Sequence, residues 1–290
     1  MSDRLESVRA AALIARDTSK LNVSSPVSGV SALRPRASAP EALEAILYAA
    51  QLLMQNGAES ERVEHTLQSC GHFLGCEISS AVVTYDALIV TYQSEEGLRT
   101  ISRSARPRAV NMSLIEEFSH LTHQVERGTV DLAQFRARTL QIESRPRSYS
   151  PAFTALIAGL GCAAFCRIFH GDWPATFATL CGASAATWLR QQLARHQVKV
   201  LISAAAAGGV SVAVVTLILW TSRLSATPQA AFSACALMLV PGVTLINSVE
   251  DAIKGHPVVA MARAAEASLV ILFAAMGCLL ATTLLAAALP

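Results

Sequence analysis

Residues 200–220 read VLISAAAAGGVSVAVVTLILW, a run of 21 residues without a charged side chain. About 20 apolar residues in a helix span the roughly 30 Å hydrocarbon core of a bilayer, so this stretch predicts a transmembrane helix. Charge is scarce around it as well. Residues 151–290 hold 11 of the 44 Lys, Arg, Asp and Glu residues, against 33 in residues 1–150. A half of the chain so poor in charge cannot cover its surface in water.

Four further apolar stretches have a similar length. They lie at residues 152–169, 173–189, 230–249 and 267–289. The five together predict an all-α transmembrane domain of about five helices within residues 148–290, with the lipid bilayer as its surroundings. Only His170, Gly171 and Asp172 join the first two stretches, which predicts a tight helical hairpin.

The basic residues predict an orientation. One set of connections holds most of them: Arg145, Arg147, Arg190, Arg195, Lys199, Lys254 and Arg263. The opposite side has only Arg167 and Arg223. The positive-inside rule then places the N-terminus in the cytosol and the C-terminus outside. Residues 1–20 lack the apolar core of a signal peptide, which agrees with a cytosolic N-terminal half.

The N-terminal half has 16 basic and 17 acidic residues, as an ordinary soluble domain would. Residues 1–38 are rich in Ser, Ala and Arg and are expected to be a disordered tail. Periodicity then predicts helices at 41–56 and 60–74, strands at 77–84, 87–93 and 98–104, and helices at 113–127 and 131–142. The expected fold of residues 39–147 is an α+β cytosolic domain of order ααβββαα. No basic patch interleaved with aromatic residues indicates nucleic-acid binding.

The fourth apolar stretch contains the most informative local sequence. Pro241 and Gly242 predict a break in its helix, because proline lacks the N–H group and glycine loosens the backbone. Broken helices inside membranes free backbone carbonyls and form solute or ion sites in many transporters. Thr244 and Asn247 place polar groups within about one turn of this break. The alternative is a simple proline kink packed against neighbouring helices.

Two charged residues are further candidates for the solute or ion pathway. Asp251 follows at the cytosolic end of the same stretch, where a shielded carboxylate could carry a proton. Its alternative role is that of a solvated helix end. Arg167, near the outer end of the first stretch, could bind a carboxylate of the solute, or extend its charge to the membrane surface.

Other chemistry finds little support. His65, Cys70, His72 and Cys76 lie close together in the sequence, but their spacing does not suit a zinc site and no CxxC motif occurs. No phosphate-binding loop, nucleophile elbow or HExxH motif is present. We therefore expect no metal, no cofactor and no catalytic residues.

Three stretches of the chain resemble the threonine/serine exporter family. The first runs from Gly57 through Glu59 and Arg62 to Glu64, after a leading helix. The second is the pair of helices that ends in Tyr149, ahead of the first apolar stretch. The third and most specific is Leu239-Val-Pro-Gly242, followed by Asn247, Asp251, Gly255 and Arg263.

The resemblance implies an exporter in a bacterial inner membrane, and not an enzyme. Some family members fuse the soluble domain to about ten spans, whereas others stop after about five and work with a small membrane subunit. The length of this chain is similar to that of the large subunit of the split form, which is associated with dicarboxylates such as succinate. The implied solute is a small organic acid or amino acid, exported with the proton gradient.

Two alternatives concern the assembly and the function. Five spans are an incomplete set for a transporter with internal repeats, so either a partner subunit or a homo-oligomer is expected. The rival function is a membrane-anchored enzyme or signalling protein that acts through residues 39–147.

Overall fold

The computed structural model describes residues 39–94, 96–106, 110–145, 149–222 and 225–288. The predicted tail at 1–38 lies outside these ranges, as do Arg147 and Arg223 of the orientation argument. The chain from Ala37 onward forms one compact unit. Two parts of it are named here by their residues. The N-terminal module is residues 39–144, and the helical bundle is residues 151–288.

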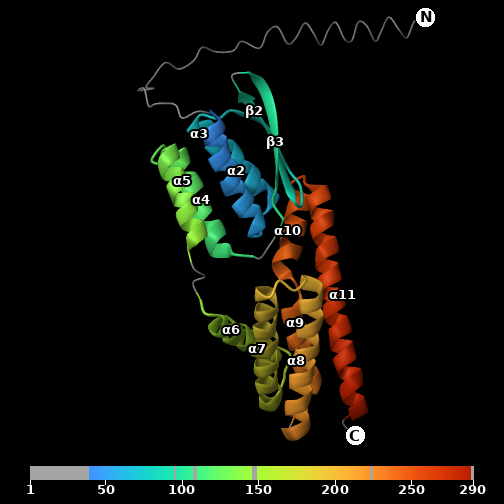
Figure 1. Ribbon diagram of the computed structural model, residues 1–290. Helices are drawn as coiled ribbons and strands as arrows, with labels where there is room; N and C mark the ends of the chain where they lie inside the picture. Colours follow the sequence, from blue (N-terminus) through green and yellow to red (C-terminus); the bar gives the residue numbers. More distant parts are fainter. Residues whose placement is uncertain (1–38, 95, 107–109, 146–148, 223–224, 289–290) are drawn as a thin grey trace, which may run out of the picture. The chain divides into compact units, whose positions relative to one another are not determined.

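The N-terminal module has the predicted order of helices and strands (Figure 1). Its elements are α2 (Ala39–Gln55), α3 (Ser60–Leu74), β1 (Ile78–Val83), β2 (Ala87–Ser94), β3 (Gly97–Ser104), α4 (Met112–Glu126) and α5 (Leu132–Ser144). The three strands form one antiparallel sheet in the order β1-β2-β3. Sequence periodicity therefore predicted this part of the fold correctly.

The core of the module lies between the sheet and the helices. Strand β2 alternates, and its Leu88, Val90 and Tyr92 are buried against the apolar face of α2. Leu43, Ile46 and other buried residues of α2 recur at helical spacing and belong to the same core. Helices α3, α4 and α5 also pack against α2. This core is separate from those of the helical bundle.

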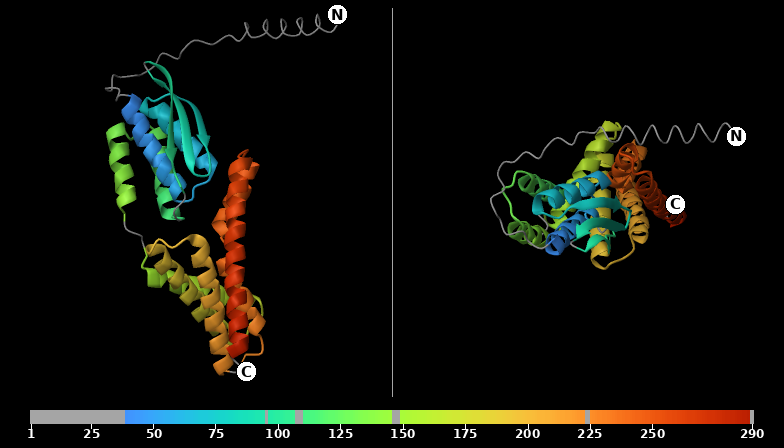
Figure 2. Two further views of the ribbon diagram at one scale, coloured as in Figure 1. Left: turned by 45° about the vertical axis from the view of Figure 1, so that its right-hand side comes forward. Right: turned by 90° about the horizontal axis from the view of Figure 1, so that it is seen from above.

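The helical bundle consists of α6 (Pro151–Ile168), α7 (Trp173–Arg195), α8 (Val200–Ser222), α9 (Pro228–Leu239), α10 (Gly242–Ile253) and α11 (Pro257–Ala288). Helix α11 runs beside α8, and α7 packs against α6, α8 and α9 (Figures 1 and 2). The hairpin between α6 and α7 is as tight as predicted: His170 has a φ of 58°, and the Gly171 N–H donates to the Cys166 carbonyl.

Small residues set the spacing of these helices. Gly277 of α11 has no room for a side chain, because a Cβ there would lie 1.9 Å from the backbone oxygen of Ala205 in α8. Buried alanines, cysteines and valines fill the contacts among α6, α7, α8 and α9. In lipid, burial of apolar surface hardly favours the association of helices, because the lipid tails are apolar too. Helices there associate by close packing of their backbones.

Not all of the five predicted spans have the length and composition of a membrane-crossing helix. Each of the five apolar stretches is helical, but within the described residues only α6, α8 and α11 are single helices long and apolar enough to cross a membrane. The pair α9 and α10 supplies a fourth span if it is taken as one bent helix. Helix α7 is long enough but less apolar, because it carries threonines, Ser184, Arg190 and Gln191. It packs against α6, α8 and α9.

The last two spans also differ in their details. The predicted break at Pro241 and Gly242 is confirmed, since α9 ends at Leu239 and α10 begins at Gly242 with a bend of 55°. Helix α11 begins at Pro257, ten residues before the predicted start at 267. Its early turns contain Arg263 and Glu266. These charges do not end the helix, because both have partners in the N-terminal module.

Candidate functional site

The turn between α2 and α3 offers unpaired backbone groups. Gly57 ends the turn after α2 with a φ of 86°, and a Cβ there would lie 3.1 Å from a side-chain carbon of Val110. A residue with a side chain would be strained in this conformation. The carbonyls of Gly57 and Ala58 and the N–H of Ser60, at the start of α3, all need partners outside the turn.

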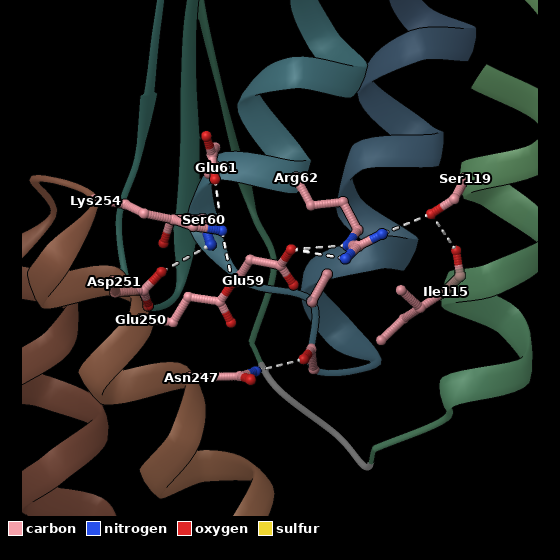
Figure 3. A network of polar contacts seen from close by, with 12 residues as sticks. Glu59, Ser60, Glu61, Arg62, Ile115, Ser119, Asn247, Glu250, Asp251 and Lys254 are labelled. Atoms are coloured by element: carbon pink, nitrogen blue, oxygen red, sulfur yellow. Dashed lines mark hydrogen bonds and ion pairs between the residues drawn. The ribbon is translucent and has the colours of Figure 1, made fainter. Parts of the chain in front are cut away.

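Helix α10 supplies two of these partners (Figure 3). Asn247 and Asp251 are four residues apart, so both side chains lie on one face of the helix. The Asn247 amide donates to the Gly57 carbonyl at 2.7 Å. The Asp251 carboxylate accepts from the Ser60 N–H at 2.9 Å. A carboxylate at this place also suits the positive end of the α3 dipole.

Helix α11 supplies the third partner. The guanidinium of Arg263 donates to the Ala58 carbonyl at 2.8 Å and forms an ion pair with Asp251, with Nε 3.1 Å from Oδ2. The Asp251 side chain is 0% exposed and that of Arg263 is 11% exposed. We call the set Gly57, Ala58, Ser60, Asn247, Asp251 and Arg263 the junction. It joins the N-terminal module to both helices that follow the break.

Charged residues surround the junction. Glu59 bonds to Arg62, whose guanidinium also donates to Ser119 at 2.8 Å. Burial raises the pKa of Glu59, but the hydrogen bonds from Arg62 and the backbone, with the charges of Arg62 and Lys254, outweigh it and hold that pKa below its usual value. Lys254 lies after α10 and pairs with Glu250 and Glu61, which together raise its pKa.

Two further contacts extend the junction along α11. The Tyr85 hydroxyl donates to Glu266 at 2.6 Å. Burial and then this hydrogen bond raise the pKa of Tyr85. His256, just before α11, lies 3.7 Å from the carboxylate of Glu64. Thus residues from α3, from the turn after β1 and from α11 hold the module and the helices together.

The family comparison covers most of the chain. A model of the threonine/serine exporter family, ThrE, matches residues 44–285. The chain belongs to this family. Membership makes it a membrane protein of a transporter family, and not an enzyme.

Named relatives agree with this assignment. The chain is 34% identical over 236 residues to a protein of Escherichia coli K12 named "Probable succinate transporter subunit YjjP", covering 80% of this chain and 90% of the relative. A protein of Klebsiella aerogenes with the same name is 32% identical, covering 80% and 89%. A "Probable threonine/serine exporter" of Mycobacterium tuberculosis is 23% identical over 78% of this chain and 42% of its own length. No solved structure matches the chain.

In this exporter-family chain, the first and the third of the three stretches that resemble the family meet at the junction. Gly57 belongs to the first, and Asn247, Asp251 and Arg263 belong to the other. Of the predicted module residues, Glu59 and Arg62 border the junction and Glu64 faces His256. In the sequence they are two separate stretches, because nothing in their spacing shows that residues about 190 positions apart touch.

Four predicted pathway residues lie outside the junction. Pro241, Gly242 and Thr244 belong to the break between α9 and α10, and the Thr244 hydroxyl makes no hydrogen bond within the part of the chain that the structure describes. Arg167 lies at the hairpin between α6 and α7. There it donates to the Gly171 carbonyl and lies 4.7 Å from the ring centroid of Trp173.

Several residues that form the site have no sequence pattern that marks them as site residues. Arg263 stands out only as a basic residue for the orientation and as part of the family likeness, and Lys254 only for the orientation. Ser60, Tyr85 and Glu266 were not considered as site residues at all. The charges in α11 are one sequence signal that points to two of these residues, Arg263 and Glu266. Arg263 and Glu266 are the only charges within the 32 residues of α11, and charges in a membrane helix require partners.

Proposed function

We propose that this chain is the large subunit of a two-component exporter in the bacterial inner membrane. Its solute is a small carboxylate-bearing metabolite, either a dicarboxylate such as succinate or the amino acids threonine and serine. The relatives support a split system. The chain spans 90% of a relative named as a subunit, but only 42% of the longer exporter, which therefore has about as much chain again.

The observation that carries the mechanism is the junction. The helix break at Pro241 and Gly242, together with Thr244, is our proposed solute site. Asn247 and Asp251 lie about one and a half and two and a half turns beyond this break, and they fix α10 to the N-terminal module. A movement of the module would therefore be transmitted to the break through α10, which makes the module a gate for the pathway.

Asp251 is our proposed proton carrier. A proton on its carboxylate would cancel the charge and weaken the ion pair with Arg263. Arg263 would then remain as a poorly solvated charge, and the contacts that hold the turn at Gly57 would loosen. Proton uptake and opening of the junction are in this way linked. Arg167 is the proposed outer contact for the solute. To bind a carboxylate of the solute, its guanidinium must give up the hydrogen bond to the Gly171 carbonyl.

The test is export from cells that lack their own exporter of this type. Co-expression of this chain with the proposed small membrane subunit is expected to release succinate, threonine or serine into the medium, and neither chain alone should do so. Mass spectrometry of the medium identifies the solute. Full export by the purified chain alone in liposomes would contradict the two-component assignment.

A second experiment tests the pathway residues. Asn247→Ala and Asp251→Asn are each expected to lower export at least severalfold while the protein still inserts into the membrane. Ser268→Ala on α11 is the matched control, since Ser268 is exposed and bonds only to its own helix. Wild-type export by both variants would remove Asn247 and Asp251 from the mechanism.

A further inference from the structure

Helix α7 has one continuous buried face within the helical bundle. Its buried residues recur at intervals of three and four positions: Ala175, Ala178, Thr179, Gly182, Ala183, Ala186 and Thr187. The next position in this series is Arg190, three residues after Thr187 and four after Ala186. Arg190 therefore lies on the side of α7 that faces protein, whereas Phe177 and Trp188 are exposed on the opposite side.

The guanidinium of Arg190 has no counter-charge. Protein atoms surround it, and no hydrogen bond or charge from the described part of the chain acts on it. A charge within a membrane bundle is unfavourable unless it is paired, so Arg190 requires an anion. The acidic residues of 151–290 all bond to other groups: Asp172 to Ser225, Glu250 to Lys254, Asp251 to Arg263 and Glu266 to Tyr85.

Contacts along α7 place Arg190 beside the helix break. The thiol of Cys235 in α9 lies 3.9 Å from the Thr179 carbonyl, and the sulfur of Met238 lies 3.2 Å from the Thr187 hydroxyl. Helices α7 and α9 thus run side by side in the same direction. Three residues beyond these last two contacts, α7 reaches Arg190 and α9 has given way to the break before α10.

The break offers further groups that bind an anion. Helix α10 begins at Gly242, and no side chain caps its first turn. The N–H groups of a first turn have no partner within their helix, and the positive end of the helix dipole attracts an anion. On α7, Gln191 lies four residues after Thr187, and its side-chain oxygen is buried without a hydrogen-bond partner among the described residues. Its amide nitrogen can donate to an anion.

We propose that Arg190 binds a carboxylate of the solute at the break, with Gln191 and the first turn of α10 as further donors. A guanidinium suits this role, because it forms two parallel hydrogen bonds with one carboxylate. Arg190 lies near the C-terminal end of α7, and Arg167 lies at the hairpin that precedes α7. In the proposed orientation, Arg190 therefore meets a solute that enters from the cytosol. The identity of the anion as the solute rests on the proposed export function, but its binding can be measured without transport.

Thermal unfolding of the purified full chain in an uncharged detergent separates this role from a structural one. Arg190→Met removes a charge that has no partner, so the midpoint without ligand should stay the same or rise. Arg263→Met should lower it, because Asp251 then loses its ion pair. Arg195→Met is the control for loss of charge, since Arg195 is exposed on the same helix. A fall for Arg190→Met as large as that for Arg263→Met would overturn the proposal.

The same measurement tests binding, because a ligand of the folded state raises the midpoint. Succinate and L-threonine are the probes, one for each proposed class of solute. At least one should raise the midpoint of wild type and of Arg195→Met, but not that of Arg190→Met. Arg190→Lys should show a smaller rise, since lysine keeps the charge but not the paired donors. Succinamide, which has no charge, should have no effect.

Two results of this measurement would overturn the proposal. One is no rise with either probe in wild type, or an equal rise in Arg190→Met. The other is a rise with phosphatidylglycerol and with neither probe, which would assign Arg190 to a lipid headgroup.

Export then tests the site within the proposed function. With the proposed small subunit, Arg190→Ala should lower export at least tenfold, Arg190→Lys should lower it less, and Arg195→Ala should leave it unchanged. If Arg190→Ala exports as wild type does, the assignment of Arg190 is wrong and the export function stands. If the probe binds in a way that depends on Arg190 but no export is found, the binding site stands and the exporter assignment is wrong.

Discussion

At the scale of single residues, the junction depends on one buried ion pair. Asp251 has no exposed surface, and its charge is balanced by Arg263 and by the N–H group of Ser60. Burying a charge is unfavourable unless it is paired and hydrogen-bonded. The pair therefore contributes little to net stability as a unit, but removal of one member leaves the other charge buried without a partner.

Asp251→Ala is accordingly expected to destabilise the chain by about 3–5 kcal/mol, the range for breaking a buried pair. Unfolding in denaturant, followed in detergent, measures this loss. Glu250→Ala is the control: Glu250 also lies near the end of α10, but its bond to Lys254 is exposed, so it should cost under about 1 kcal/mol. An equal loss in the free energy of unfolding for the two variants would contradict the role of Asp251 in a buried ion pair.

Glu59 predicts a pH dependence. Its pKa is lowered in the folded chain, because the hydrogen bond and charge of Arg62 outweigh the effect of burial. A carboxylate with a depressed pKa adds stability above the usual glutamate value of about 4.3, and this is lost as the pH falls through its folded value. Thermal unfolding measured between about pH 3 and 7 should thus show a steeper acid loss in wild type than in Glu59→Gln. Identical slopes would contradict this.

At the scale of elements, the bundle is held by backbone contacts at glycine. Helices α8 and α11 approach so closely at Gly277 that a Cβ would meet the backbone of Ala205. The backbone of a packed helix cannot yield as a flexible side chain would, so the two helices would have to separate. Since α11 carries Arg263 and Glu266, its position on α8 also fixes where the N-terminal module is held.

Gly277→Ala is therefore expected to cost at least 1–3 kcal/mol, about the usual range for overpacking, although it adds only one methyl group. A lower midpoint of thermal unfolding in detergent would show this. Gly161→Ala is the matched control, because it is also a helical glycine of the bundle but has no atom within 4 Å of the added carbon. Gly161→Ala should leave the midpoint unchanged or raise it, because alanine favours a helix more than glycine does. A similar fall in both variants would mean that the contact at Gly277 is not the cause.

At the scale of the whole molecule, the number of times that the chain crosses the bilayer decides on which side each end lies. Helices α6, α8, α11 and the bent pair give four crossings, which would place both ends of the bundle on one side. A fifth crossing by α7 would place them on opposite sides. Helix α7 is less apolar than the others because it packs against three helices, and a helix surrounded by protein does not need a lipid-facing surface.

We predict five crossings, with the N-terminal module in the cytosol and the C-terminus in the periplasm. A reporter active only in the periplasm should therefore be active when fused after residue 290, and inactive when fused before residue 39. A reporter active only in the cytosol should give the opposite result. Activity of the same reporter at both ends would show that α7 does not cross.

The sequence by itself determined the local structure of this protein. Alternation in β2, the apolar spacing of α2 and the break at Pro241 each depend on residues within a few positions of one another, and periodicity reports such burial directly. Scarcity of charge indicated residues 151–290 as the part of the chain expected to lie in lipid. The sequence also showed the resemblance to the family around Gly57 and around Asp251, as two separate stretches.

Only the tertiary structure decided that these two stretches form one site. Periodicity shows that α10 is amphipathic, but it does not show what contacts its polar face. The partners of Asn247 and Asp251 are backbone groups of a turn, which no side chain identifies in the sequence. Backbone groups become specific only when a fold exposes them at a particular place, and that depends on how α2, α3 and α11 pack.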